Sequence, residues 1–221
     1  MGGDFAIARV LFRPWARRRY FAAHSVRKLH LGCGARIVPG WLNADKFTWR
    51  SDIFLDAYRR FPFPDASFRM IYSEHLLEHL RIDRVERFLR EVHRVLEDGG
   101  LFRMSCPDLE LFASRYVAGD RQFFRPILDH FERKRTTRPH PKYWVLRTTG
   151  GAFMSRAMFF HNHRWMYDFE TLRSCLQEVG FGRIVKQPYR QSLVDEAGAM
   201  DGSERDWESL YVDAVKGDPP Y

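Results

Sequence analysis

Two histidines and a glutamate stand at a spacing that could hold a metal ion. They lie in His75-Leu-Leu-Glu-His79, which matches H-x-x-E-H, the signature of inverted zinc proteases. On a helix the two histidines would face the same way, and the glutamate could activate a water bound to the metal. A zinc site needs a third ligand, however, and no later segment suggests an obvious one. Short motifs also match by chance, so we expect no metal site here.

A second set of candidate residues follows short apolar runs that are predicted to be strands. Its members are Gly32-Cys33-Gly34, Asp45, Asp56, Ser73 to His75 and Asp108. In open α/β sheets the carboxyl ends of the strands lie at one edge, where ligands bind. We therefore expect these residues to converge on one site.

The Gly-x-Gly pair after the first strand predicts a close approach of the backbone to a nucleotide-like ligand. A dinucleotide site would also need a third glycine and a full helix whose N-terminus meets the pyrophosphate. Here Arg36 replaces a glycine, and Asp45 follows Gly34 by only eleven residues, too few for a crossover helix. A cofactor with a ribose and an adenine but no phosphate fits better, with Asp45 on the ribose hydroxyls and Asp56 on the adenine amine. Taken singly, each aspartate is explained equally well by a turn that ends a strand.

The elements that must position these residues alternate along the chain. Strands are predicted at residues 26–31, 41–44, 53–55, 70–72, 101–105, 183–187 and 210–215. Amphipathic helices are predicted from Asp83, as N-cap, to Leu96 and from Asp168 to Val179. This alternation indicates a doubly wound α/β fold with a seven-stranded, mostly parallel sheet. The last two strands have no evident helix between them, so we expect an antiparallel edge strand.

Several stretches together resemble the class I S-adenosylmethionine-dependent methyltransferases. They are Leu29-His-Leu-Gly-Cys-Gly34, Gly40-Trp-Leu-Asn-Ala-Asp45, Phe61 to Leu80 and Leu96-Glu-Asp-Gly-Gly-Leu-Phe102. Within that family the chain is similar to the small bacterial type-11-like members, often linked to cell-surface saccharide synthesis. The resemblance covers residues 26–108 and resumes at 165–189 and at the last strand. It implies a Rossmann-like fold, S-adenosyl-L-methionine as cofactor, and a single domain at 26–221 with a helical, aromatic insertion at 109–165.

The resemblance also implies how the cofactor is held. The implied cofactor-binding residues are His30, Gly32, Cys33, Gly34, Asp45, Asp56, Ser73 and Glu74. Gly32 and Gly34 would face the methionine moiety, and residues 73–75 would lie beside the sulfonium and the acceptor. His30 stands where the family usually has an acid, which leaves the contact to the amino end of the cofactor open. Arg36 replaces the third glycine, consistent with a shortened first helix.

Methyl transfer from a sulfonium is a direct displacement, for which the protein supplies alignment and exclusion of water. A hydroxyl acceptor also needs a base to take its proton. His75 is the first candidate, because it lies at the strand edge and titrates near neutral pH, although it would serve equally as a structural cap of the turn. Asp108 is the second candidate. The third is His163, together with His161, in a segment that leads back towards the sheet.

Residues 109–165 are aromatic, basic and weakly periodic, and we expect them to choose the substrate. Their rings suit stacking on sugars, although most would equally form the core of a helical subdomain. The rings are Phe112, Tyr116, Phe123, Phe124, Tyr143, Trp144, Phe159 and Phe160. The expected acceptor is a small molecule or saccharide, with phosphorylated and lipid-linked forms included. A catalytically inactive methyltransferase-like binding domain is the non-enzymatic alternative.

The chain of 221 residues carries a net charge of +8, which fits an anionic partner. Arginines and apolar residues mix in the basic segment 1–25, which would either touch an anionic membrane or pack on the domain. An RNA or DNA methyltransferase is the main alternative, but no nucleic-acid module is visible. The amino-methyltransferase motif Asp218-Pro-Pro-Tyr221 also stands at the wrong place in the chain. With no apolar span, secretory signal or paired cysteines, we expect a cytoplasmic protein, with peripheral contact at the inner face of the membrane as an option.

Overall fold

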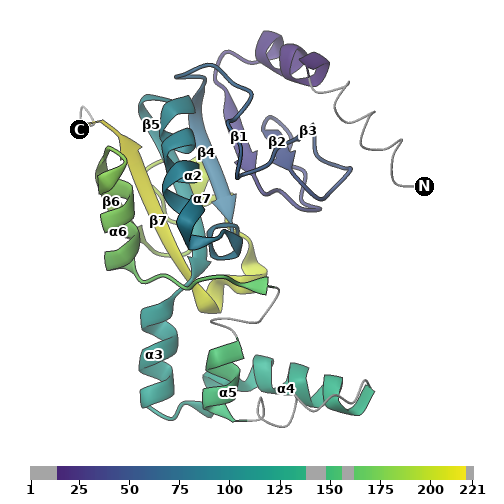
Figure 1. Cartoon of the computed structure of the whole chain (residues 1–221), viewed down its shortest axis with the longest axis vertical. Coiled ribbons are helices and arrows are strands. Elements are labelled where there is room, and N and C mark those ends of the chain that lie inside the picture. Colours follow the sequence, from purple (N-terminus) through teal and green to yellow (C-terminus); the bar gives the residue numbers. More distant parts are fainter. Residues whose placement is uncertain (1–13, 138–147, 156–161, 218–221) are drawn as a thin grey trace.

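The computed structural model in Figure 1 describes residues 14–137, 148–155 and 162–217. Within these ranges, seven strands form one sheet in the order β3-β2-β1-β4-β5-β7-β6. Their bounds are β1 Lys28–Leu31, β2 Leu42–Asp45, β3 Ile53–Phe54, β4 Phe68–Glu74, β5 Leu96–Pro107, β6 Phe181–Gln187 and β7 Ser209–Lys216. The helices are η1 Leu77–His79, α2 Ile82–Val95, α3 Leu109–Val117, α4 Arg121–Thr137, α5 Thr149–Met154, α6 Phe169–Glu178, α7 Asp195–Gly198 and η5 Ser203–Glu208.

The strands of the sheet are parallel except for β7. The pairs β1–β2, β2–β3, β1–β4 and β4–β5 are all parallel. β7 pairs antiparallel with both β5 and β6, so the antiparallel strand lies one position inside the edge that β6 forms. Only α7 and η5 separate β6 from β7, and antiparallel neighbours do not need a full crossover helix. The predicted fold class is confirmed.

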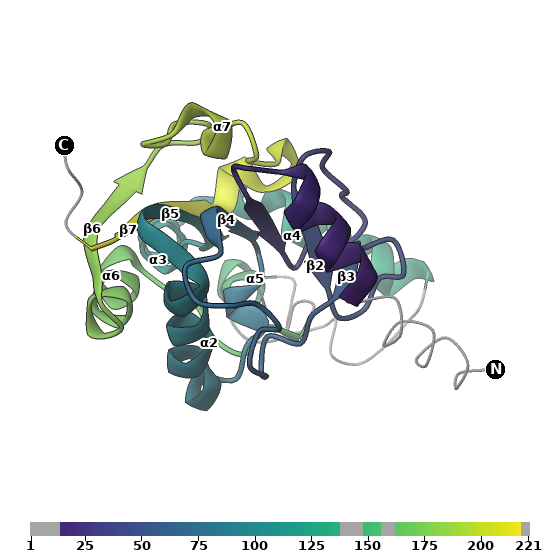
Figure 2. The same cartoon turned by 90° about the horizontal axis from the view of Figure 1, so that it is seen from above.

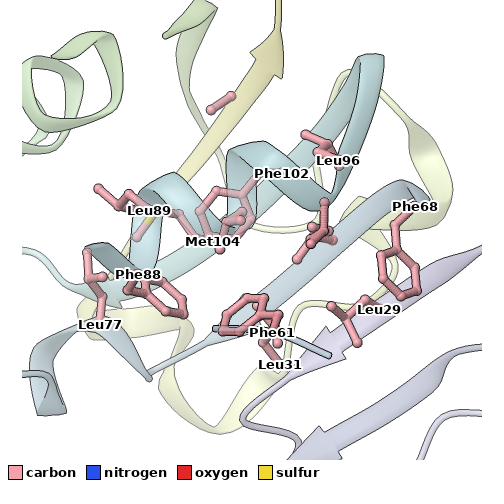
Figure 3. Close-up of a cluster of buried hydrophobic side chains, with 14 of the residues drawn as sticks. Leu29, Leu31, Phe61, Phe68, Leu77, Phe88, Leu89, Leu96, Phe102 and Met104 are labelled. Carbon is pink, nitrogen blue, oxygen red and sulfur yellow. The ribbon is translucent and has the colours of Figure 1, made fainter. Parts of the chain in front are cut away.

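Helices cover both faces of the sheet. α2 and α6 lie on one face and α7 on the other (Figure 2). The main core fills the space between the sheet and α2, where Phe88 and Leu89 meet Phe102 and Met104 of β5 (Figure 3). A smaller cluster on the face of α7 includes Trp41. Both faces are therefore buried, as a doubly wound fold requires.

α2 shows how the sequence pattern produces this packing. Val85, Phe88 and Leu89 recur at helical spacing, and all three are buried. The predicted N-cap was wrong, however, because the helix begins at Ile82 and Arg81 occupies the cap position without a side-chain cap bond. The carboxylate of Asp83 instead pairs with the Arg81 guanidinium at 3.0 Å. Core packing, rather than capping, decides where this helix begins.

The insertion after β5 forms a helical layer of its own. α3, α4 and α5 lie beyond the carboxyl ends of the parallel strands (Figure 1). Phe112 and Phe124 are fully buried at the centre of this layer, so these two rings form its core. Tyr116 is 46% exposed and is accessible to a ligand. The predicted stacking residues Tyr143, Trp144, Phe159 and Phe160 lie outside the described residues, as does His161.

The N-terminal segment enters the described structure as a helix at residues 14–23. Tyr20 fixes it to the sheet, because its hydroxyl donates to Lys28 O at 2.9 Å. Phe21 adds a stacked contact with Phe63. The rest of the basic segment, residues 1–13, and the motif at 218–221 lie outside the described residues. Among the residues that are described, no helix combines the length and apolar character needed to cross a membrane.

Candidate active site

A cavity of ≈ 960 Å³ opens at the carboxyl ends of β1 and β4. Its wall comes from the loop after β1, the end of β4 with η1, and the segment between β6 and β7. The lining residues are His30, Gly32, Cys33, Ala35, Arg36, Glu74, His75, His79, Arg190, Asp201, Gly202, Ser203, Glu204 and Arg205. This is where open α/β sheets bind ligands. The structure thus places five of the predicted site residues in one wall: His30, Gly32, Cys33, Glu74 and His75.

The glycine loop is held against β2 by its own backbone. Gly32 N donates to Ala44 O at 2.9 Å, and Gly34 N donates to Asp45 Oδ2 at 3.0 Å. Gly32 has a φ of +66°, and a Cβ there would lie 3.2 Å from the side chain of Leu76. A larger residue would therefore be strained and crowded, so the close approach of this backbone to the cavity depends on glycine.

The aspartates at the ends of β2 and β3 already hold protein groups. Asp45 accepts backbone amides from Gly34 and from residues 47–48. A carboxylate offers about four acceptor sites, so a ligand that needs both ribose contacts must displace one of these amides. Asp56 pairs with Lys46 Nζ at 3.0 Å, and this contact helps to hold its pKa low even though partial burial raises it. Neither aspartate lines the cavity, so their contacts with the cofactor stay predictions.

His30 lines the cavity as a neutral ring. Its Nδ1 lies 3.2 Å from Asn43 Oδ1, which also accepts from Val38 N at 2.9 Å. Because the Asn43 oxygen is an acceptor, Nδ1 carries the proton and the lone pair of Nε2 is the acceptor that His30 offers. Burial lowers the pKa of His30 to about 4, so the ring stays uncharged at neutral pH. It is thus equipped to accept a hydrogen bond from an ammonium group.

The buried His30 should also make the protein less stable in acid. Below the ordinary pKa of 6.5 the unfolded chain binds a proton that the folded chain refuses until about pH 4. Stability is therefore lost as the pH falls through this window, by about 2 kcal/mol at pH 5 relative to pH 7.5. We expect His30→Gln to remove this part of the loss, measured by urea denaturation at both pH values. An identical pH dependence of the free energy of unfolding in the native chain and in His30→Gln would contradict this role of His30.

Glu74 joins the two sides of the cavity. Its carboxylate pairs with Arg36 Nη1 at 3.1 Å, beside the glycine loop. It also accepts from Gly202 N at 3.2 Å, in the segment between β6 and β7. Glu74 therefore positions both walls, in addition to any contact that it makes with a ligand.

A buried ion network anchors the far wall to the middle of the sheet. Arg103 of β5 donates through Nε to Asp201 Oδ1 at 2.8 Å and through Nη1 to Asp213 Oδ1 at 2.9 Å. Arg190 N donates to Asp201 Oδ2 at 2.8 Å. All three charged side chains of the network are fully buried. The position of residues 190–205 therefore depends on Arg103.

Three histidines surround the carboxylate of Glu78 beside the cavity. Glu78 Oε1 lies 2.9 Å from Nδ1 of His75. The same oxygen lies 4.0 Å from Nε2 of His79 and 4.0 Å from Nε2 of His163. Burial raises the pKa of Glu78, but its contact with His75 and the nearness of His79 and His163 more than offset this and hold the pKa below its usual range. The cluster therefore contains an ionised carboxylate in the protein interior.

The chain that returns from the helical insertion completes this cluster. Arg164 N and Trp165 N both donate to Glu78 O, at 2.6 and 3.3 Å. These bonds dock the returning segment on η1, which carries Glu78 and His79. His163 is thereby placed next to residues that precede it by more than eighty positions in the sequence.

His75 is tied at both ring nitrogens. Its Nε2 lies 2.8 Å from Ser209 Oγ, which itself donates to Arg205 O at 2.6 Å. Ser209 therefore accepts from Nε2, while Nδ1 faces Glu78. The φ of +47° at His75 turns the chain sharply from β4 into η1. Its predicted role as base requires one of these contacts to break, and it stays a prediction.

His79 is the more exposed of the two cluster histidines that line the cavity. Its side chain is 30% exposed and contributes to the cavity wall, whereas the side chain of His163 is fully buried and lies behind it. The two rings meet edge to face with centroids 4.9 Å apart. Geometry therefore favours His79 as the group that meets a ligand. The sequence analysis had singled out His79 only as the second histidine of the H-x-x-E-H motif.

Asp108 and Ser73 lie behind the wall. Asp108 caps α3 by accepting from Leu111 N at 3.2 Å, and it pairs with Lys186 Nζ at 3.2 Å. Ser73 is 3% exposed within β4. Neither lines the cavity, so the predicted base function of Asp108 and the predicted cofactor contact of Ser73 stay untested predictions.

Comparison with known families decides what kind of site this is. Residues 42–104 match the family model of the type 11 methyltransferase domain. The matched stretch runs from β2 into β5 and includes Glu74, Glu78 and His79. Residues 42–104 thus belong to an S-adenosylmethionine-dependent methyltransferase domain.

Solved structures show the same fold. A SAM-dependent methyltransferase from Archaeoglobus fulgidus aligns with a TM-score of 0.50 and 13% identity, over 97% of this chain and 95% of that one. The CMeT domain of the citrinin polyketide synthase aligns with a TM-score of 0.50 and 11% identity, over 93% of this chain and 53% of that one. No curated protein matches the sequence. At these identities the structural likeness concerns the fold and not the acceptor.

S-adenosyl-L-methionine is the cofactor of this methyltransferase, and the loop after β1 fits it. Residues 32–41 form turns, and no helix follows β1 there to present an N-terminus to a pyrophosphate. S-adenosylmethionine has no phosphate, so it does not need such a helix. His30, in the wall beside Gly32, offers an acceptor of the kind that the amino group of its methionine end requires.

The sequence reasoning missed the far wall of the methyltransferase. For its residues between β6 and β7 the sequence predicted only a connection without an evident helix. One usable signal was present: Arg103 stands in the apolar strand segment Leu101-Phe-Arg-Met-Ser105. A charge in a buried strand demands acidic partners, and aspartates in the later polar loop and last strand can supply them.

Proposed function

We propose that this methyltransferase transfers the methyl group of S-adenosylmethionine to a hydroxyl oxygen of a polar small molecule or saccharide. The character of the cavity wall carries the proposal. Among the described residues that line it, none is a branched aliphatic residue and none is Phe, Tyr or Trp. Such a wall suits a hydroxyl-rich acceptor better than a flat aromatic ring or a lipid chain.

The charges of the wall favour an acceptor that carries a phosphate or carboxylate. Arg190, Arg205 and Glu204 line the cavity, and within the described ranges none of these three side chains makes an ion pair. Arg36 is already paired with Glu74, and Asp201 with Arg103. The two remaining guanidinium groups therefore outnumber the one remaining carboxylate, which fits phosphorylated saccharides, sugar nucleotides and lipid-linked saccharides.

The protein's own residues would orient the two reactants. Gly32 allows the cofactor to approach the backbone, and His30 accepts from its amino end. His79 meets the acceptor hydroxyl on the other side of the cavity. We further propose that α3, α4 and α5 select the acceptor, since they lie beyond the same edge of the sheet (Figure 1). The cofactor supplies the methyl cation equivalent, and alignment of the hydroxyl with the methyl carbon is the task of the wall.

A radiolabelled transfer assay tests this function. The full chain is incubated with methyl-labelled S-adenosylmethionine and separate panels of free saccharides, sugar phosphates, sugar nucleotides, catechols and RNA. We expect label in a hydroxyl-bearing polar panel, with phosphorylated members favoured. Label only in RNA or only in catechols would overturn the proposed acceptor class and, for RNA, restore the nucleic-acid alternative.

Calorimetric titration with S-adenosylhomocysteine separates cofactor binding from acceptor choice. We expect Asp45→Ala to weaken binding by about 10²-fold or more, because hydrogen bonds to a charged group contribute about 1.5–3 kcal/mol each. Asp83→Ala, which removes an exposed carboxylate on α2, is the matched control and should bind normally. Equal affinity in both variants would remove Asp45 from the cofactor site.

A further inference from the structure

Glu78, His79 and His163 bring three ligand atoms to one point. One carboxylate oxygen and one nitrogen from each ring lie within 4.8 Å of one another. The two distances of 4.0 Å from Glu78 Oε1 are too long for hydrogen bonds. Ligands at about 2.0–2.1 Å from a tetrahedral zinc ion lie about 3.4 Å apart. Small side-chain rotations would therefore close the three atoms around an ion.

The carboxylate of Glu78 lacks the donors that a buried charge needs. It is fully buried, and among the described residues no donor reaches its Oε2. Its one close contact is Nδ1 of His75 at 2.9 Å. A cation on the other side would compensate the remaining charge. An outer partner such as His75 is also what a metal-bound carboxylate commonly has.

The arrangement matches a catalytic rather than a purely structural metal site. Two histidines and one glutamate form a ligand set of catalytic zinc sites, which keep a further position open. His163 and Glu78 are buried, while His79 reaches the cavity wall. The open position of an ion held by these three would therefore face the cavity.

We propose that Glu78, His79 and His163 bind one divalent transition-metal ion, and that its open position takes the acceptor hydroxyl. This deepens the proposed function and rests on it. The sequence predicted no metal site, because H-x-x-E-H lacked a third ligand. The third ligand is His163, and His75 supports Glu78 instead of binding the ion.

The ion would activate the hydroxyl without changing the balance of the reaction. Coordination would lower the pKa of the hydroxyl, and its proton would leave to solvent. The oxygen then attacks the methyl carbon, a C–O bond forms, and the C–S bond breaks with its electron pair remaining on sulfur. The products are the methyl ether, S-adenosylhomocysteine and one proton.

Metal content tests the site independently of activity. The untagged full chain is loaded with zinc chloride, dialysed, and analysed by mass spectrometry of metals, and the cobalt form is analysed by visible absorption. We expect about one ion per chain and the spectrum of a tetrahedral cobalt site. Glu78→Gln and His163→Ala should each bind zinc at least about 10²-fold more weakly. His24→Ala, whose ring contacts Tyr20 O outside the cluster, is the matched control.

Each outcome bears on one claim. Zinc at well below one equivalent, or equal zinc in all variants, overturns the metal site. If Glu78→Gln does not fold, His163→Ala and the cobalt spectrum decide. Transfer that survives complete removal of metal by a chelator overturns the ion's role but leaves the proposed function standing. Stoichiometric metal without transfer to any hydroxyl acceptor leaves the site standing and removes its proposed role.

Discussion

Replacing Arg103 by methionine should lower the free energy of unfolding by about 3–5 kcal/mol. Arg103 is fully buried and is the shared partner of Asp201 and Asp213. Methionine fills a similar space but leaves two carboxylates buried without their cation. The loss comes from this uncompensated charge, and urea denaturation followed by circular dichroism measures it.

An exposed ion pair provides the control. Arg90 pairs with Glu86 one helical turn away on α2, with both side chains more than half exposed. Arg90→Met should change the free energy of unfolding by less than about 0.5 kcal/mol. Adding Asp201→Asn and Asp213→Asn to Arg103→Met should recover part of the loss. A loss below about 1 kcal/mol in Arg103→Met would show that the network is not anchoring the far wall.

Replacing His79 by alanine should lower kcat by about 10²–10⁴-fold, the usual contribution of a group that assists proton removal, whether it acts directly or as a ligand of the proposed ion. The reason is its position, because it is the most exposed histidine of the cluster in the cavity wall and its ring packs edge to face on His163. Affinity for S-adenosylhomocysteine should stay close to that of the native chain, because the proposed role of His79 is towards the acceptor and not the cofactor. The assay uses the best acceptor from the transfer panel, together with calorimetry of S-adenosylhomocysteine.

A histidine outside the site separates this effect from general damage. His24→Ala removes a ring of the N-terminal helical segment and should leave kcat unchanged. His75→Gln adds a second comparison, since both nitrogens of that ring are occupied by Glu78 and Ser209. If His79→Ala retained full kcat while His75→Gln lost it, the predicted base would be His75 after all.

Much of the fold could be predicted from the sequence because helices and strands follow local patterns of residues. The spacing of Val85, Phe88 and Leu89 predicted α2, and Asp168 predicted the start of α6, which it caps by accepting from Thr171 N at 2.8 Å. The position of β7 in the sheet was harder to predict. Hydrophobic pattern marks a strand but does not say which neighbours it pairs with, and β7 entered the sheet between β5 and β6.

The meeting of several predicted site residues at one edge of the sheet could also be predicted from the sequence, because these residues stand at strand ends. A Gly-x-Gly directly after β1 and polar residues after β4 must meet at the carboxyl edge of a parallel sheet, and His30, Gly32, Cys33 and Glu74 do line one cavity. The far wall could not be predicted in this way, because bonds to residues distant in the sequence place Arg205 and its neighbours at the cavity.

By itself, then, the sequence determined the class of fold, since periodicity acts over a few positions, and its resemblance to a family indicated the S-adenosylmethionine cofactor. Only the tertiary structure decided which residues share the wall proposed for the acceptor. It brought His163 back to Glu78 and His79 across the insertion, and it held residues 190–205 in place through Arg103. These contacts join segments more than eighty residues apart. Their geometry is set by the packing of the helices together with the pairing of the buried charges, and local sequence patterns do not encode either.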